Sequence, residues 1–192
     1  MKTKQVIWTF ALALLCGLLI FTCQYTLKDC LWWECVPERD FHVLDLELPV
    51  FLFPDKTYLS PISPSSEGGG EIERGSQSIF WDDGDRVAIY SIYRYPTIKR
   101  AIRAFKFYID YMVDSETKKP WIHPNEVIFS SPTADEMIIA CGNWSERRCG
   151  MLARYQEYVI FFNATMDEKM TYTEFEKIAT YLDEQISSRL YP

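Results

Sequence analysis

The sequence opens with a run of twenty residues, 6–25, that holds no charged side chain and is apolar almost throughout. At about 1.5 Å per residue, a helix of this length matches the ~30 Å hydrocarbon core of a bilayer. Lys2 and Lys4 precede the run, and positive charge favours a cytoplasmic N-terminus. We therefore expect residues 1–27 to form a signal anchor, a transmembrane helix that leaves the rest of the chain outside the cytoplasmic membrane.

Two other interpretations of this segment stay open, a cleaved secretory signal and a lipoprotein signal. A cleaved signal needs small residues after a short apolar core. The small residues at 11–13 lie inside the run, and the bulky Phe21 lies close before Cys23. We therefore favour an uncleaved, single-pass anchor through residues 6–25, at the cell membrane.

Composition limits the partners of the remaining part of the chain. About 160 residues follow the anchor, enough for one domain with a sizeable core. Aromatic residues make up 16% of the chain, which favours a packed core over disorder. The net charge is −7, and an acidic surface repels a phosphate backbone, so nucleic acid is not an expected partner.

Four cysteines follow the anchor: Cys30, Cys35, Cys141 and Cys149. An even number outside the cytoplasm indicates disulfides, and four cysteines allow three pairings. Proximity favours Cys30 with Cys35 and Cys141 with Cys149. Spacings of C-x4-C and C-x7-C are not typical of zinc modules, and an oxidising compartment disfavours free thiolates. No metal or cofactor is therefore expected.

The first part of the chain after the anchor divides by composition. Residues 28–40 are expected to form a juxtamembrane neck, and residues 41–192 the extracytoplasmic domain. Apolar and β-branched residues predict a strand at about 42–48. Residues 54–76 are rich in Pro, Ser and Gly, which predicts a flexible surface loop.

A hairpin and a helix are predicted next. The runs 78–81 and 86–93 flank an Asp-Gly turn at 82–85, a strong short-range hairpin signal. Pro96 and Thr97 are expected to open a helix, and from Ile98 to Met112 apolar residues recur at spacings of four and three. That period predicts one amphipathic helix.

The remaining elements are expected in this order: a polar loop at 115–125, strands at 127–130, 137–141 and 150–163 with a break at 156–157, and a helix at 171–189. Strands in groups with helices between them indicate an α+β domain with a mainly antiparallel sheet. Each of the two amphipathic helices has one apolar face, so both should cover this sheet. The order of elements resembles small α+β scaffolds of the PsbP/Mog1-like kind, a likeness that implies a fold and no activity.

No catalytic constellation stands out. His42 and His123 are the two histidines, neither lies beside a Cys or Ser motif, and no G-x-S-x-G elbow occurs. Asp82, Asp83 and Asp85 carry the oxygen ligands that calcium prefers, but turn chemistry accounts for them and the EF-hand pattern is absent. We therefore assign no catalytic, cofactor-binding or metal-binding residue.

One basic helix face is a candidate interaction surface. Four basic residues lie mainly away from the apolar face of the first predicted helix: Lys99, Arg100, Arg103 and Lys106. They are suited to anionic headgroups or an acidic partner, although a solvated helix face accounts for the same pattern.

The leading interpretation is a membrane-anchored, extracytoplasmic binding or protein-interaction domain with a protein or small-ligand partner, and not an enzyme. One alternative is a small extracytoplasmic hydrolase that uses carboxylates. Another is an accessory subunit of a membrane complex, in which Cys16, Gly17 and Cys23 would lie on a helix-packing face, because small residues permit close approach.

Overall fold

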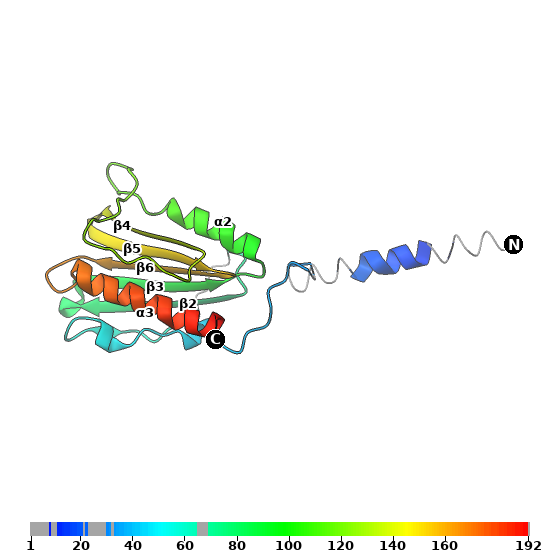
Figure 1. The fold of residues 1–192 in the computed structure, drawn as a ribbon, viewed down its shortest axis with the longest axis horizontal. Helices are drawn as coiled ribbons and strands as arrows, with labels where there is room; N and C mark the ends of the chain where they lie inside the picture. The colour runs from blue at the N-terminus through cyan, green and yellow to red at the C-terminus, as the bar shows by residue number, and fades with distance from the viewer. Residues whose placement is uncertain are drawn as a thin grey trace. The chain divides into compact units, whose positions relative to one another are not determined.

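The computed structural model describes most of the chain, namely residues 8, 11–20, 22, 30–31, 33–64 and 69–191. The chain forms two compact units that divide between Pro37 and Glu38, within the expected neck. The second unit is an antiparallel sheet with helices, which confirms the predicted α+β class (Figure 1).

The first unit contains a helical stretch at residues 11–20 and a disulfide between Cys30 and Cys35. Across the part of the chain that the structure describes, no helix has both the length and the apolar character needed to cross a bilayer. Both ends of the expected span at residues 6–25 lie outside the described residues, and so does Cys23.

The sheet has six antiparallel strands in the order β1-β2-β3-β6-β5-β4. The strands are β1 (Tyr58–Leu59), β2 (Glu73–Trp81), β3 (Arg86–Arg94), β4 (Glu136–Trp144), β5 (Glu146–Tyr155) and β6 (Tyr158–Thr165). The predicted Asp-Gly hairpin joins β2 to β3 through a short 3-10 turn, η3 (Asp82–Gly84). The predicted break at 156–157 separates β5 from β6, with Gln156 at a φ of 53°.

Two helices complete the domain, close to where the apolar periods predict them. Helix α2 covers Ile98–Ile109, and the Thr97 hydroxyl caps it by accepting a hydrogen bond from the Arg100 amide. Helix α3 covers Tyr172–Leu190, and the Thr171 hydroxyl caps it in the same way. Side-chain caps of this kind satisfy an amide that would otherwise lack a partner at the helix start.

One face of the sheet packs against α3, which crosses in front of the strands in Figure 1. Alternate residues of a strand point to the same face, so Tyr158, Ile160 and Phe162 of β6 all enter this core. Buried residues from the preceding segment close its remaining side: Phe41, Val43, Leu46, Leu48 and Phe53.

The predicted strand at 42–48 is wrong, because this segment contains a 3-10 turn, η1 (Val43–Asp45), and a second one, η2 (Val50–Leu52), follows it. The segment lies over the sheet face instead of pairing at a sheet edge. The buried Gln77 side chain compensates, accepting from the Leu48 amide at 2.9 Å and donating to the Leu48 carbonyl at 3.3 Å. One side chain thus replaces a strand partner.

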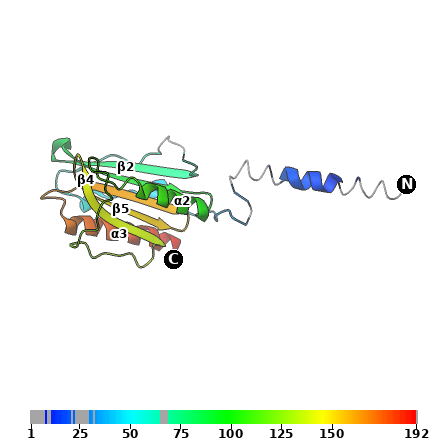
Figure 2. The ribbon, with the colours of Figure 1, turned by 90° about the horizontal axis from the view of Figure 1, so that it is seen from above.

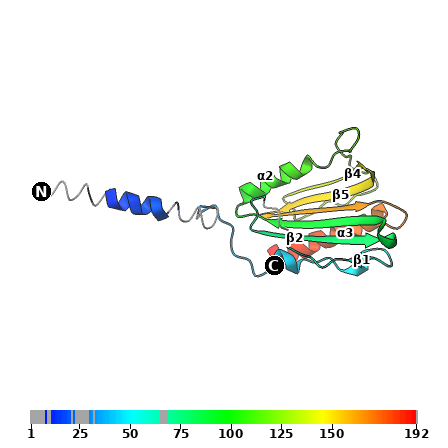
Figure 3. The same cartoon turned by 180° about the vertical axis from the view of Figure 1, so that it is seen from behind.

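The opposite face packs against α2 through a second core that includes Phe105, Leu152 and Val159. Trp121 also lies on this face, and a Cβ at Gly142 would come within 2.0 Å of the indole ring. In Figure 3, β2 and its neighbour β3 face the viewer, and no described helix covers them. Helix α2 therefore covers part of its face and leaves an open border beside it.

Two further predictions need correction. The expected strand at 127–130 is irregular, because Val127 is buried while Ile128 projects into solvent and no strand pairs with them. The expected loop at 54–76 contains β1, a bridge from Ser63 to Ser76, and the start of β2. Hydrogen bonds to β2 therefore order part of this Pro- and Ser-rich segment.

The second expected disulfide joins Cys141 to Cys149, which lie opposite each other on β4 and β5. In Figure 2, β4 runs in front of β5 at the sheet edge. Replacing both cysteines with serine should lower the free energy of unfolding by about 2–3 kcal/mol, because the closed loop no longer restricts the unfolded chain. Thermal and urea unfolding under oxidising conditions measure this loss.

The matched control replaces Cys30 and Cys35, whose disulfide lies outside the unit formed by residues 38–192. That variant should unfold at the wild-type temperature. Equal destabilisation by both double variants, or no effect of the Cys141/Cys149 variant, would contradict the assignment.

Candidate binding site

A groove with a volume of about 500 Å³ lies along α2 on its open border. Its lining comes from the segment before β2, the residue directly after β3, and α2. The lining residues are Gly69, Tyr95, Arg100, Arg103, Ala104, Phe107 and Tyr108. We call this feature the α2 groove. It contains two of the four residues of the predicted basic face.

The helical period explains how these side chains reach the groove. Ala101 and Phe105 are buried against the sheet. At 3.6 residues per turn, Arg100, Arg103 and Phe107 then point sideways and outward. Lys99 and Lys106 are exposed on α2 and do not line the groove. The structure therefore divides the predicted basic face into a groove wall and an outer surface.

The aromatic floor of the groove consists of Tyr95, Phe107 and Tyr108, and further rings pack against Tyr108. Tyr108 stacks on Tyr93 of β3, with ring centroids 5.1 Å apart, and on Phe161 of β6 at 6.3 Å. The guanidinium of Arg74 lies 4.9 Å from the centre of the Tyr93 ring. Stacked rings and a cation over a ring face each stabilise such a cluster. The floor is therefore ordered before any ligand arrives.

The tyrosine hydroxyls at the groove are donors at neutral pH. Burial raises the pKa of Tyr95 to about 12, and the negative charge of Glu71 adds to the rise. Burial also raises the pKa of Tyr108, with a further contribution from hydrogen bonding to Tyr93. Protonated phenols and arginines donate hydrogen bonds. The groove is thus suited to a ligand with an anionic group and a flat or apolar body.

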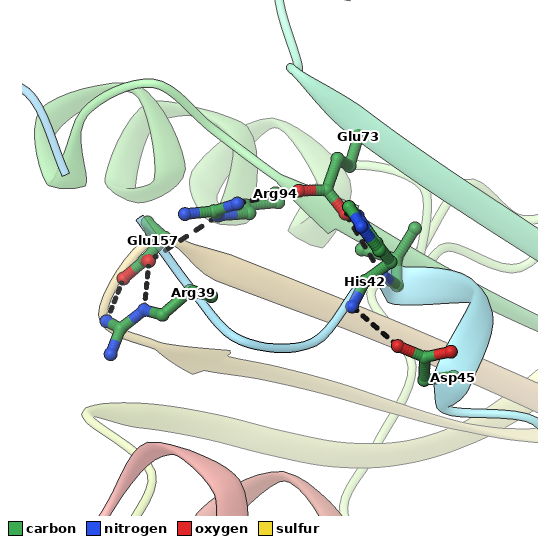
Figure 4. Close-up of polar contacts among 7 residues, drawn as sticks. Arg39, His42, Asp45, Glu73, Arg94 and Glu157 are labelled. Atoms are coloured by element: carbon green, nitrogen blue, oxygen red, sulfur yellow. Dashed lines mark hydrogen bonds and ion pairs between the residues drawn. The ribbon is translucent and has the colours of Figure 1, made fainter. Parts of the chain in front are cut away.

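A second polar group of residues lies where the domain begins, and Figure 4 shows it in close-up. Glu157, in the turn between β5 and β6, is fully buried. Arg39 binds it with two parallel contacts of 2.8 Å, from Nε to Oε1 and from Nη2 to Oε2. Arg94 Nε lies 3.6 Å from the same Oε1. Two arginines thus neutralise one buried carboxylate.

The same group of contacts continues to β2. Arg94 Nη1 lies 2.6 Å from Glu73 Oε1, and the other oxygen of Glu73 accepts from the Val43 amide at 3.1 Å. His42 Nδ1 is 3.4 Å from that oxygen, and the His42 amide donates to Asp45. We call these residues with Arg39 and Glu157 the charged cluster. Its carboxylates are engaged in fixing the chain, which is a structural role.

His123 holds the backbone in the structure. Its two ring nitrogens lie 2.9 Å from the Ile139 carbonyl and 3.1 Å from the Val127 carbonyl. A second pocket of about 330 Å³ beside it includes Cys141 and Arg147. His123 therefore fastens the irregular segment after α2 to edge strand β4.

The acidic turn at Asp82, Asp83 and Asp85 has basic neighbours instead of a ligand-like arrangement. Lys169 forms an ion pair with Asp82, and Arg86 lies 3.7 Å from Asp167 in the adjoining loop. Within the described residues, no three His, Cys, Asp or Glu side chains gather in a way that could hold a metal ion.

Sequence reasoning found the basic side of the α2 groove and missed its aromatic side. Tyr93 lies near the end of β3, Tyr95 directly follows that strand, and Tyr108 lies more than ten residues later on α2. A signal was present in the sequence, since Phe107 and Tyr108 near the end of α2 and Tyr111 just after it form an aromatic group beside the apolar face. These rings meet Tyr93 only when the fold brings β3 and α2 together.

Comparison with known proteins adds no family to this description. No protein-family model matches the chain, and no curated protein matches it either.

The charged cluster generates a prediction about stability. Glu157→Gln keeps the shape of the buried side chain but removes its charge, leaving the partly exposed Arg39 without its carboxylate partner. The free energy of unfolding should fall by about 3–5 kcal/mol, the usual cost of breaking a buried ion pair. Urea unfolding measures it.

Asp45→Asn is the matched control, because Asp45 is exposed and an amide oxygen can still accept from the His42 amide. That change should stay within about 0.5 kcal/mol of wild type. Similar effects from the two variants would show that burial and pairing of Glu157 contribute little.

Proposed function

We propose that this chain is a single-pass, membrane-anchored protein whose extracytoplasmic domain binds an anionic ligand in the α2 groove. The observation that carries the proposal is the pairing of Arg100 and Arg103 with a stacked aromatic floor, in a groove of about 500 Å³. Ligand sites commonly have this size and this combination of ring surfaces with a few charged groups.

The side chains of the groove indicate the chemistry of the ligand. The planar guanidinium of arginine donates two parallel hydrogen bonds to a phosphate or carboxylate group. The rings of Phe107 and Tyr108 offer apolar surface beside Arg100 and Arg103. The protein as a whole carries a net charge of −7, so a local group of cations would direct an anion to this groove.

The location rests on the sequence of the first 30 residues and on the cysteines. The uncharged run at 6–25 follows Lys2 and Lys4, as in a signal anchor with a cytoplasmic N-terminus. The disulfides of both units suit an oxidising compartment. These features support a domain held outside the cytoplasmic membrane.

Binding is favoured over hydrolysis by carboxylates because the most buried acids are already engaged. Glu157 and Glu73 are bound by arginines in the charged cluster. Buried Asp183 accepts hydrogen bonds from the hydroxyls of Tyr155 and Thr133. These contacts hold segments of the fold together.

The ligand proposal is tested by titrating the full-length protein with phenyl phosphate and with inorganic phosphate. Phenyl phosphate should bind more tightly, because its ring covers the aromatic floor. Arg103→Glu should weaken phenyl phosphate binding at least tenfold, about 1.4 kcal/mol, and added salt should weaken wild-type binding. Isothermal titration calorimetry measures both constants.

Lys177→Glu is the matched control, with the same change of charge on an exposed residue of α3. Its affinity should stay within about twofold of wild type, since surface charges distant from a site are screened. Equal losses in the two variants would assign the effect to net charge and reject the α2 groove as the site.

The anchor is tested by extracting cell membranes with alkaline carbonate. The full-length protein should stay in the membrane pellet, and a variant with Leu14→Lys and Leu18→Lys should enter the supernatant, because charges at the centre of a span oppose insertion. A mature protein that begins near Gln24 and appears in the supernatant would instead identify a cleaved signal.

A further inference from the structure

We infer that the anionic ligand of the α2 groove is the phosphate-bearing headgroup of an anionic lipid in the membrane that anchors the chain, so that α2 docks on the bilayer surface. This inference rests on the proposed function and names its ligand. Three observations carry it: the side chains that α2 exposes, the point where the tether enters the domain, and the length of that tether.

Basic and aromatic side chains share the exposed side of α2. Lys99, Arg103, Lys106 and Phe107 are exposed there, and Tyr111 is exposed in the turn directly after the helix. Phe107 and Tyr111 show 56% and 53% of their surface. At 3.6 residues per turn, the four positions within α2 cover an arc of about 100°. Basic residues with aromatic residues beside them are typical of helices that lie in the headgroup region.

The aromatic part of this arc distinguishes a bilayer from a soluble anion. The rings of Phe107 and Tyr111 are 5.1 Å apart and meet edge to face. They extend the apolar surface outward from the groove. A small soluble anion in contact with Arg103 would leave Tyr111 exposed. A lipid surface offers anionic headgroups to the basic residues and an apolar boundary to the two rings.

The first residues of the domain are joined by contacts to the start of α2. Arg39 binds Glu157, and the carbonyl of Glu157 accepts from the Tyr95 amide at 2.9 Å. Tyr95 lies two residues before Thr97, which caps α2. One short path of contacts thus joins the first residues of the domain to the first turn of the helix and to the groove.

The covalent tether is short. The apolar run ends at residue 25, and the Cys30–Cys35 disulfide holds those two Cα atoms 5.2 Å apart. Even with every other residue fully extended, the chain from residue 25 to Arg39 reaches at most about 40 Å. A groove at this end of the domain therefore stays near the membrane at a high effective concentration.

Charge favours an anionic membrane and confines the contact to α2. The protein carries a net charge of −7, so an anionic bilayer repels most of its surface. The exposed side of α2 differs, because it carries three basic residues, Lys99, Arg103 and Lys106, and Asp110 is the acidic residue beside them. Attraction of basic residues to anionic lipid acts only within about one Debye length, ~8 Å at physiological salt. The helix must therefore lie at the surface to gain from it.

The experiment uses the full-length protein in lipid nanodiscs, made from phosphatidylcholine alone or with added phosphatidylglycerol. Hydrogen–deuterium exchange of peptides covering residues 98–111 is the readout. Exchange in the anionic nanodiscs should be at least threefold slower than in the neutral ones. Arg103→Glu with Lys106→Glu should remove this difference. Lys118→Glu with Lys119→Glu, the same charge change on an exposed loop, should keep it.

Equal exchange of residues 98–111 in both kinds of nanodisc would overturn the lipid inference. If phenyl phosphate still bound in an Arg103-dependent way, the proposed function would stand without it. If phenyl phosphate also failed to bind, both would be rejected. Protection of α2 by poly-glutamate in neutral nanodiscs, with none from phosphatidylglycerol, would identify an acidic protein partner and likewise overturn the inference.

Discussion

The burial of Glu157 is the constraint on which the arrangement of this domain depends. A carboxylate taken from water is costly unless a cation and further hydrogen bonds compensate it. Arg39 and Arg94 supply that compensation from two distant parts of the chain. Arg39 thereby fixes the start of the domain, and the segment that follows it lies across the α3 side of the sheet. The turn between β5 and β6, through Glu157, thus fixes the position of Arg39, from which residues 41–53 continue over the α3 side of the sheet.

The two faces of the sheet are covered to different extents, and the candidate site results from that difference. Helix α3 and residues 41–53 close one face. Helix α2 packs on the other over part of its width, with Met112 and Trp121 from the segment that follows it. At its uncovered side, the end of β3 and the side of α2 meet without filling the space between them. Phe107 and Tyr108 therefore line a groove instead of completing a core. Arg100 and Arg103, which would face solvent on an isolated helix, form the wall of this groove.

Local patterns in the sequence predicted the elements whose own residues determine them. The apolar period of α2, the Asp-Gly turn before β3 and the break at Gln156 act over a few residues, and all three occur in the structure. The segment at 42–48 was misread because its apolar residues suit a strand, whereas the buried Gln77 side chain meets its backbone. The basic side of the groove follows from one helix. Its aromatic floor depends on Tyr93 and Tyr108 coming together, which no local pattern reports.

The disulfide between Cys141 and Cys149 has a consequence for the outer border of the sheet. Strand β4 lies at one edge, and an edge strand is able to pair with another chain through its free backbone groups. Exchange of β4 between two copies would require it to separate from β5. The covalent bond links these neighbours directly, so thermal opening of the edge cannot release β4. The oxidised protein is thereby protected against exchanging this strand with a second copy of the chain.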